Sequence, residues 1–285
     1  MALITASELR ARLRDGADSV RVADVRWYLG QPDRGRVEYE AGHIPGAIFV
    51  DHDTVLSARE GPGRHPLPRP ADLAARLGEL GIGSEHLVVA YDDVGGTTAA
   101  RLWWMLDDLG HAQVAVLDGG LSAWRSAGGE VSTDVPRWPA GRLRLADRWS
   151  KVIDREGLKS RLGAVVILDA RAAERYRGEV EPVDPVAGHI PTAHSAPATG
   201  NLGPDGRFLP PDQLAARFAG IGDESGPVVS SCGSGTTASH NALAMRVAGL
   251  PDPILYPGSY SDWSRSGEAV ATGSAPGRAE QVSRG

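Results

Sequence analysis

The second half of this 285-residue sequence repeats the first half. The segment GIGSEHLVVAYDDVGGTTAA, which begins at Gly81, aligns without a gap with GIGDESGPVVSSCGSGTTAS, which begins at Gly220. The same offset of 139 residues continues downstream, where Gly119 matches Gly258. Solenoid repeats have far shorter periods, so this repeat indicates two duplicated domains.

Shorter motifs upstream repeat in the same order. DVR at Asp24 matches DAR at Asp169, and AGHIPGA around His43 matches AGHIPTA around His189. The offset there is larger, as loops of different length would make it. Because the two histidines also recur in the half without a cysteine, we expect the GHIP motif to build the fold.

The repeat suggests boundaries for the parts of the chain. We expect an N-terminal domain over residues 1–132, a Pro-rich linker without clear periodicity over 133–150, and a C-terminal domain over 151–272. Residues 273–285 are mostly small and polar, which is typical of a disordered tail.

Short apolar segments alternate with helical segments in both halves. The first half contains the β-like VRVADV, LVVAYD and VAVLDG and the helical DLAARLGELG and TTAARLWWMLDDLG. The second half contains AVVILDA, PVVSS and PILYPG with DQLAARFAGIG and TTASHNALAMRVAGL. Strands that are apolar throughout and separated by helices predict a parallel sheet with helices on both faces. The fold class is therefore α/β, present twice. Near the N-terminus, Thr5 and Glu8 predict a capping box at the start of a helix.

Cys232 is the only cysteine in the chain, and the formal net charge is -6. A single cysteine cannot form an intramolecular disulfide or a Cys-rich zinc site, so it is a small buried residue or a reactive thiol. The sequence has no Lys/Arg-dense stripe for nucleic acid and no apolar run that could span a membrane. Since the first residues lack the apolar region of a signal peptide, we expect a cytoplasmic protein. No metal or organic cofactor is indicated.

Cys232 stands between a predicted strand and a glycine-rich turn. The preceding PVVSS places it at the carboxyl end of the strand, where α/β sheets bind ligands. Gly233 and Gly235 allow a nest, a turn whose backbone N–H groups converge on an anion, and the next helix adds its positive dipole end. We therefore expect a thiolate that is stabilised by the amides of this loop, those of Thr236 and Thr237 included.

Other enzymes with glycine-rich loops need residues that are missing here. A cysteine-dependent phosphatase needs an arginine six positions after the nucleophile, where this chain has Ala238. A nucleotide-binding loop needs a lysine, and this loop has none. Thiolate chemistry on a small anion remains, and the alternative is a non-catalytic module that binds an anion or a partner.

As a set, the tandem halves, the GHIP motifs, the DGG and YPG turns before tryptophan and the CGSGTTA loop resemble the two-domain rhodaneses. This family comprises thiosulfate and 3-mercaptopyruvate sulfurtransferases. The resemblance extends from about Leu3 to Ala271, and it implies that sulfur is carried as a persulfide on Cys232. The residue that matches Cys232 in the first half is Asp93, a carboxylate that cannot form a persulfide. We therefore expect only the C-terminal domain to be catalytic.

The resemblance implies a double displacement. The Cys232 thiolate takes the sulfane sulfur of a small anionic donor, either thiosulfate or 3-mercaptopyruvate, and sulfite or pyruvate leaves. The persulfide then passes its sulfur to a thiol or to cyanide. The uncharged CGSG loop resembles the mercaptopyruvate enzymes, because the thiosulfate enzymes have basic residues after the cysteine.

The resemblance also assigns a proton-handling set to the mercaptopyruvate reaction. Ser234 matches the serine of that set, His65 in RHPLP matches its histidine, and Asp53 in FVDHD matches its carboxylate.

Recognition of the donor carboxylate falls to arginine, whose planar fork suits it. Arg175 in AERYRG matches the first carboxylate-binding arginine of the family. The second would lie near Val183, in EVEPVDP, where this chain has no arginine. Arg177 is the nearby arginine that could replace it, although its position is typical of a surface residue.

Overall fold

The computed structural model describes residues 2–221 and 226–279 and divides into two compact units. The first unit comprises Met1–Ala58, Leu67–Ser150 and Pro204–Phe208. The second comprises Arg59–Pro66, Lys151–Gly203 and Leu209–Gly285. Each unit therefore includes a short segment that lies within the other unit's part of the sequence.

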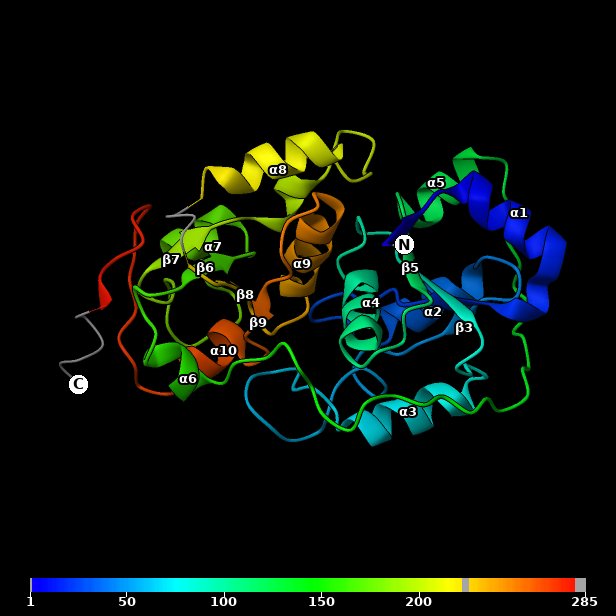
Figure 1. The fold of residues 1–285 in the computed structure, drawn as a ribbon, viewed down its shortest axis with the longest axis horizontal. Helices are drawn as coiled ribbons and strands as arrows, with labels where there is room; N and C mark the ends of the chain where they lie inside the picture. The colour runs from blue at the N-terminus through cyan, green and yellow to red at the C-terminus, as the bar shows by residue number, and fades with distance from the viewer. Residues whose placement is uncertain (1, 222–225, 280–285) are drawn as a thin grey trace. The chain divides into compact units, whose positions relative to one another are not determined.

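The first unit is built on a parallel five-stranded sheet with the order β1-β5-β4-β2-β3 (Figure 1). The strands are β1 (Leu3–Ile4), β2 (Val20–Asp24), β3 (Ile48–Phe49), β4 (Leu87–Tyr91) and β5 (Val114–Leu117). Val22 pairs with Val89, and Val89 pairs with Ala115. These central strands are almost fully buried, which explains their continuous apolar sequence.

Five α-helices cover this sheet, with α1 and α5 together on one side and α3 on the other (Figure 1). They are α1 (Ala6–Gly16), α2 (Arg34–Ala41), α3 (Pro70–Glu79), α4 (Ala99–Asp108) and α5 (Gly120–Ser126). Leu9 and Trp124, from α1 and α5, pack on the sheet face that carries Val89. The predicted capping box of α1 is confirmed, because Thr5 Oγ1 accepts from the Glu8 N–H at 3.2 Å and Glu8 accepts from the Thr5 N–H at 2.9 Å.

The second unit repeats this plan with a parallel four-stranded sheet of order β7-β6-β8-β9. Its strands are β6 (Val166–Asp169), β7 (Ala193–Ser195), β8 (Val228–Ser231) and β9 (Ile254–Leu255). Its α-helices are α6 (Arg155–Lys159), α7 (Ala173–Arg177), α8 (Pro211–Ala219), α9 (Ala238–Val247) and α10 (Ser259–Trp263). Val152 forms a parallel bridge with Leu255, at the edge where the first unit has β1.

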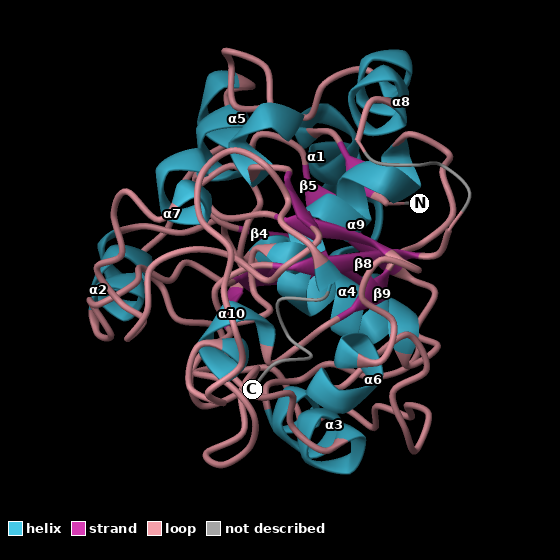
Figure 2. Cartoon of the chain, turned by 90° about the vertical axis from the view of Figure 1, so that its left-hand side faces the viewer, coloured by secondary structure: helices cyan, strands magenta, loops and turns pink. Residues whose placement is uncertain are grey.

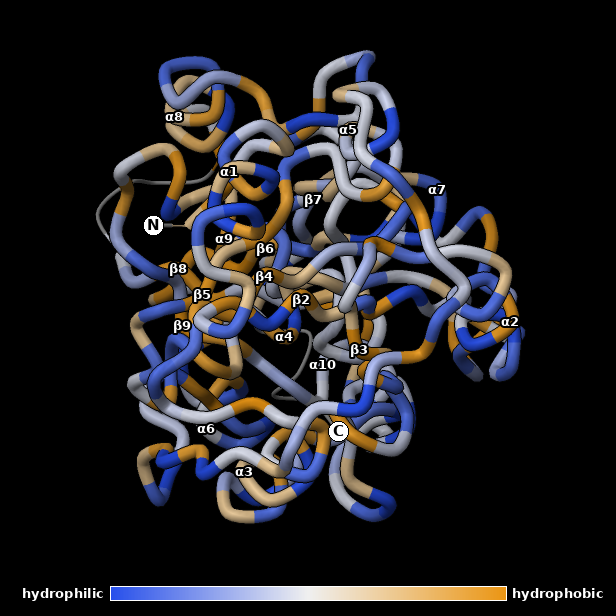
Figure 3. Tube along the Cα trace, turned by 90° about the vertical axis from the view of Figure 1, so that its right-hand side faces the viewer, coloured by the Kyte–Doolittle hydropathy of each residue, from blue (hydrophilic) through white to orange (hydrophobic). Residues whose placement is uncertain are grey.

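Figure 2 shows the strands in magenta and the helices in cyan, and β4, β5, β8 and β9 lie toward the middle of the view. The hydropathy colouring of Figure 3 agrees, with orange along β4, β5, β6 and β8. The predicted fold class, two α/β units with a parallel sheet each, is therefore confirmed. Within the described part of the chain, no helix combines the length and apolar character needed to cross a membrane.

The repeated GHIP histidines hold backbone segments together. Nδ1 of His43 lies 2.8 Å from the Tyr39 carbonyl, and Nδ1 of His189 lies 2.7 Å from the Tyr176 carbonyl. Each imidazole also stacks on that tyrosine, with ring centroids 4.0 and 3.7 Å apart. Both histidines are fully buried, so they have the structural role that their recurrence predicts.

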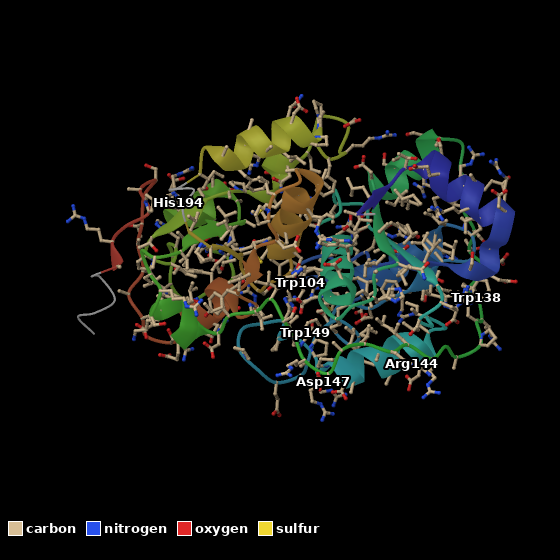
Figure 4. All side chains as sticks on the ribbon, viewed as in Figure 1. Trp104, Trp138, Arg144, Asp147, Trp149 and His194 are labelled. Atoms are coloured by element: carbon tan, nitrogen blue, oxygen red, sulfur yellow. The ribbon has the colours of Figure 1, made fainter. Side chains whose placement is uncertain are left out.

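Residues 133–150, the expected linker, are counted with the first unit, where they form no helix or strand. The indole N–H of Trp138 donates to the carbonyl of Gly46 at 3.1 Å. Trp149 stacks on Trp104 with ring centroids 5.6 Å apart (Figure 4). This segment therefore belongs to the packed structure of the first unit.

The expected tail, residues 273–285, begins with residues that pack on the second unit. The Thr192 N–H donates to the Pro276 carbonyl at 2.6 Å, and Nε2 of His189 lies 3.1 Å from the carbonyl of Ala275. The remainder of the tail, residues 280–285, lies outside the described residues.

Candidate functional site

Cys232 follows β8 directly, at the carboxyl end of a strand that lies between β6 and β9. Its side chain is 2% exposed. The loop of residues 232–237, here called the Cys232 loop, leads into α9. The cysteine therefore lies at the ligand-binding edge of the sheet, as its place after PVVSS predicts.

Gly235 places its backbone N–H against the cysteine sulfur. The N–H donates to Cys232 Sγ at 3.1 Å. Gly235 has a φ of +80°, and a Cβ there would lie 2.6 Å from the carbonyl oxygen of Pro257. Only glycine fits this turn without strain, and its amide provides a hydrogen bond to a sulfur that bears negative charge.

The backbone of Cys232 is fixed by the start of α10. The Cys232 N–H donates to Ser259 Oγ at 3.1 Å, and the Cys232 carbonyl accepts from the Tyr260 N–H at 2.9 Å. Ser259 has a φ of +52°, and the matching residue of the first unit, Gly120, has a φ of +56°. A serine in this left-handed conformation is uncommon, and such residues cluster at functional sites. Ser259 was not predicted from the sequence. The available signal was that this serine aligns with Gly120, the second glycine of the DGG turn.

The equivalent loop of the first unit is occupied by a side chain of its own. The carboxylate of Asp92 is fully buried, and it accepts five hydrogen bonds of 2.7–3.0 Å. The donors are the N–H groups of Val94, Gly96, Thr98 and Ala99 and the hydroxyl of Thr98. The nest of the first unit therefore already holds an anion.

The matching residue of the second unit is Ser231, whose Oγ is buried and has no hydrogen-bond partner among the described residues. The amide of Gly96 serves the Asp92 carboxylate, whereas its counterpart, Gly235, serves the cysteine sulfur. Asp93, at the position of the cysteine, is exposed and accepts from the Tyr28 hydroxyl at 2.5 Å. The first unit therefore has no thiol at this position, and the Asp92 carboxylate fills its nest.

Ser234 and His65 lie together in the second unit. A hydrogen bond of 2.7 Å joins Ser234 Oγ and His65 Nδ1. His65 comes from residues 59–66, which pack with the second unit. Asp53 lies in the first unit, where its carboxylate accepts from the indole N–H of Trp27 at 3.1 Å.

Arg175 reaches the Cys232 loop from α7. Its Nη2 donates to Glu181 at 2.6 Å, and its Nη1 lies 3.6 Å from the position that a Cβ on Gly233 would occupy. Arg177 instead pairs with the exposed Glu179 at 2.7 Å. Arg175 is therefore beside the loop, and Arg177 is the surface residue that its position suggested.

A second guanidinium beside the loop comes from Arg64, which sequence reasoning missed. Its Nη2 lies 2.8 Å from the Cβ position of Gly233, and its Nη1 pairs with Asp184. The uncharged sequence of the Cys232 loop therefore does not exclude positive charge beside it. Arg64 supplies a positive charge beside the loop. It directly precedes the predicted residue His65, and this was the only signal for Arg64 in the sequence.

Burial is the largest single influence on the pKa values of Arg64, Asp184 and Glu181. It lowers the pKa of Arg64, and the charge of Arg175 lowers it further, against the opposing effects of Asp184 and Cys232. Burial also raises the pKa of Asp184, although Arg64 opposes this. The pKa of Glu181 is lowered, because its hydrogen bonds from Arg175 and from the Asp184 N–H outweigh its burial.

The sequence matches the model of the rhodanese-like domain twice, at residues 5–127 and 154–266. The chain belongs to the rhodanese family. A probable 3-mercaptopyruvate sulfurtransferase of Pseudomonas aeruginosa is 47% identical over 95% of this chain and 98% of its own. A putative thiosulfate sulfurtransferase of Mycobacterium tuberculosis is 44% identical over 92% of this chain and 93% of its own. The crystal structure of the 3-mercaptopyruvate sulfotransferase SseA from Escherichia coli matches with a TM-score of 0.79 and 33% identity, over 91% of this chain and 98% of that one.

These relatives confirm the predicted class, so this tandem rhodanese is a sulfurtransferase. Both donor names occur among its relatives, as the two donors of the sequence prediction anticipated.

Proposed function

We propose that this rhodanese moves a sulfane sulfur from thiosulfate or 3-mercaptopyruvate to a thiol or cyanide acceptor through a persulfide on Cys232. The observation that carries the proposal is the hydrogen bond from the Gly235 N–H to Cys232 Sγ. The matching amide of the first unit is engaged by the Asp92 carboxylate. Of the two equivalent loops, only the Cys232 loop has this backbone N–H donating to a nucleophile.

The transfer has two covalent steps. With 3-mercaptopyruvate, Cys232 Sγ attacks the donor sulfur, the C–S bond breaks, and the enolate of pyruvate leaves and takes up a proton. With thiosulfate, the donor S–S bond breaks, and sulfite leaves with the electron pair. An acceptor nucleophile then attacks the outer sulfur and releases the Cys232 thiolate. The Gly235 amide stabilises negative charge on sulfur in both steps.

We favour 3-mercaptopyruvate as the donor because its leaving group needs a proton, whereas sulfite leaves without one. Ser234 lies two residues after the nucleophile and is hydrogen-bonded to His65, and the pair is suited to deliver that proton. Arg175 has a guanidinium beside the loop, which suits the donor carboxylate. We retain Asp53 as the third member of the proton-handling set on the family resemblance.

We also place the reaction in the cytoplasm, where thiols are kept reduced. Cys232, the only cysteine, has no partner in this chain for a structural disulfide. A single cysteine without a disulfide partner is consistent with a compartment that keeps thiols reduced.

The proposal is tested by incubating the protein with thiosulfate or with 3-mercaptopyruvate and measuring its intact mass. We expect a gain of one sulfur atom that cyanide removes. Parallel reactions with equal concentrations of the two donors show which one loads the enzyme faster. If neither donor adds sulfur, the proposed function is wrong.

Ser234→Ala should reduce kcat/KM for 3-mercaptopyruvate by roughly 10²-fold, the usual contribution of a positioned proton donor. The reaction with thiosulfate should change far less, because sulfite leaves without a proton. His65→Gln should likewise reduce kcat/KM for 3-mercaptopyruvate far more than for thiosulfate. Steady-state kinetics with both donors measure this difference, and Ser160→Ala at the exposed end of α6 is the control. Equal losses with both donors would contradict a role in proton transfer.

A further inference from the structure

The start of α10 holds the backbone of the nucleophile on both sides. The Cys232 N–H donates to Ser259 Oγ at 3.1 Å, and the Cys232 carbonyl accepts from the Tyr260 N–H at 2.9 Å. The next carbonyl, that of Gly233, accepts from the Ser261 N–H at 2.9 Å. Ser259 is the member of this set that acts through its side chain.

The Ser259 hydroxyl is itself held in one orientation. Its Oγ donates to the Tyr256 carbonyl at 2.8 Å, so its proton points to that carbonyl and a lone pair faces the Cys232 N–H. Ser259 is fully buried. A substrate that enters from solvent therefore does not touch the hydroxyl, and any effect on the reaction must pass through Cys232.

The corresponding turn of the first unit binds a backbone carbonyl but has no hydroxyl. There the Leu121 N–H donates at 3.0 Å to the carbonyl of Asp92, the residue that directly follows β4. Gly120 stands at the position of Ser259, and a Cβ on Gly120 would overlap with the Asp92 carbonyl oxygen. Only the turn of the second unit, the one beside the cysteine, accommodates a side chain at this position.

The backbone conformation at Ser259 favours glycine. Its φ of +52° is unfavourable for a residue with a Cβ, whereas glycine adopts such a conformation readily. Gly120 has nearly the same φ, +56°, without that strain. A serine in place of glycine adds strain and a hydroxyl, which points to a role for the hydroxyl.

The peptide group between Ser231 and Cys232 is held at both ends. Its carbonyl accepts from the Ala170 N–H at 2.8 Å, and its N–H donates to Ser259 Oγ. Because the peptide is planar, its tilt sets the direction of the Cα–Cβ bond of Cys232 and hence the position of Sγ. Sγ accepts from the Gly235 N–H at 3.1 Å. Loss of the hydroxyl leaves a buried N–H unpaired, and the peptide tilts toward another acceptor.

We propose that Ser259 is a positioning residue for sulfur transfer, whose hydroxyl binds the Cys232 N–H and so holds Sγ against the amide of Gly235. The inference rests on the proposed function for the identity of the nucleophile. Since Ser259 acts on the nucleophile itself, it should affect every reaction of Sγ alike. The pair of Ser234 and His65, by contrast, should affect only the donor whose leaving group needs a proton.

Alkylation of Cys232 by iodoacetamide measures the reactivity of Sγ without sulfur transfer. Sγ attacks the methylene carbon, an S–C bond forms, the C–I bond breaks and iodide leaves. The label is unique because Cys232 is the only cysteine. Ser259→Gly and Ser259→Ala should each lower the alkylation rate constant, and kcat with both donors, by roughly tenfold, as a small misplacement of a reacting atom does. KM should change little, because Ser259 does not touch the donor.

The stabilities of the two variants separate positioning from folding. Glycine adopts the left-handed φ without strain, whereas alanine keeps the strain and loses the same two hydrogen bonds. Thermal unfolding should therefore show that Ser259→Ala melts below Ser259→Gly, although both react equally slowly with iodoacetamide.

Ser266→Ala, just beyond the end of α10, is the matched control. Ser266 Oγ donates to the Trp263 carbonyl at 2.7 Å and accepts from the Glu268 N–H at 3.3 Å, the same two kinds of hydrogen bond that Ser259 makes. Its loss should leave the alkylation rate and the turnover with both donors unchanged.

Wild-type alkylation rates in the folded Ser259 variants overturn the inference. A normal rate in Ser259→Gly with a slow one in Ser259→Ala does so too, because reactivity would then follow stability. The same holds for an equal loss in Ser266→Ala, for a loss with only one donor, and for a wild-type thiol that iodoacetamide does not reach. If Ser259→Ala does not fold, the glycine variant decides the question. Since alkylation needs no persulfide, failure of the proposed function would be seen separately, in the mass measurement.

Discussion

Cys232→Ser should lower sulfur transfer by about 10⁴-fold or more, as removal of a covalent nucleophile does in other enzymes. The serine hydroxyl can still accept the hydrogen bond that the Gly235 N–H now donates to Sγ. A serine oxygen cannot, however, form the persulfide. Initial rates with 3-mercaptopyruvate and with thiosulfate, together with intact mass after incubation with each donor, measure the loss.

The fold of this variant should remain intact. Circular dichroism and thermal unfolding should show a native protein whose melting temperature changes by only a few degrees, because the substitution replaces one small atom. Cys232→Ala is the companion variant, since it leaves the Gly235 amide without its sulfur acceptor. Turnover by either variant at more than trace level would exclude Cys232 as the sulfur carrier.

Asp92→Ala should reduce the free energy of unfolding by about 3–5 kcal/mol, which is typical of breaking a buried network around a charged group. The five hydrogen bonds that the carboxylate accepts would be lost, and buried N–H groups would remain unpaired. For a protein of this size, the melting temperature should fall by roughly 10 °C. Urea unfolding and calorimetry measure the two quantities.

The neighbouring Asp93→Ala is the matched control. Asp93 is exposed, and its carboxylate accepts a hydrogen bond from the Tyr28 hydroxyl, so its loss should cost less than about 1 kcal/mol. If the two variants are equally stable, the Asp92 carboxylate is not the anion that holds the first nest together.

The sequence predicts most of this fold because its strongest signals are periodic. The internal repeat and the apolar strands anticipate two parallel sheets, and the order β3-β2-β4-β5 of the first sheet recurs as β7-β6-β8-β9. The position of Cys232 follows from the same pattern, since a residue directly after a strand must lie at the end of the sheet. The pairing of Ser234 with His65 was anticipated by the family resemblance, because nothing in their spacing indicates that they meet.

The site residues that were not predicted lie in loops, where the sequence has no hydrophobic periodicity. Arg64 stands in a loop rich in glycine and proline, whose path is set by tertiary packing. Alignment of the halves placed Asp93 on Cys232, but it could not show that the preceding carboxylate, Asp92, turns back into its own loop. Ser259 was missed because a positive φ at a serine is a property of the folded backbone.

The assignment of residues 59–66 to the second unit bears on how the duplicated gene could evolve. The first copy has Asp93 in place of the cysteine, but it still supplies residues to the second unit. It encodes His65, which is hydrogen-bonded to Ser234, and Arg64, which is paired with Asp184. A descendant gene reduced to its second half would inherit the thiol without these side chains. The chemistry of the second unit thus depends on residues that the first half of the sequence supplies.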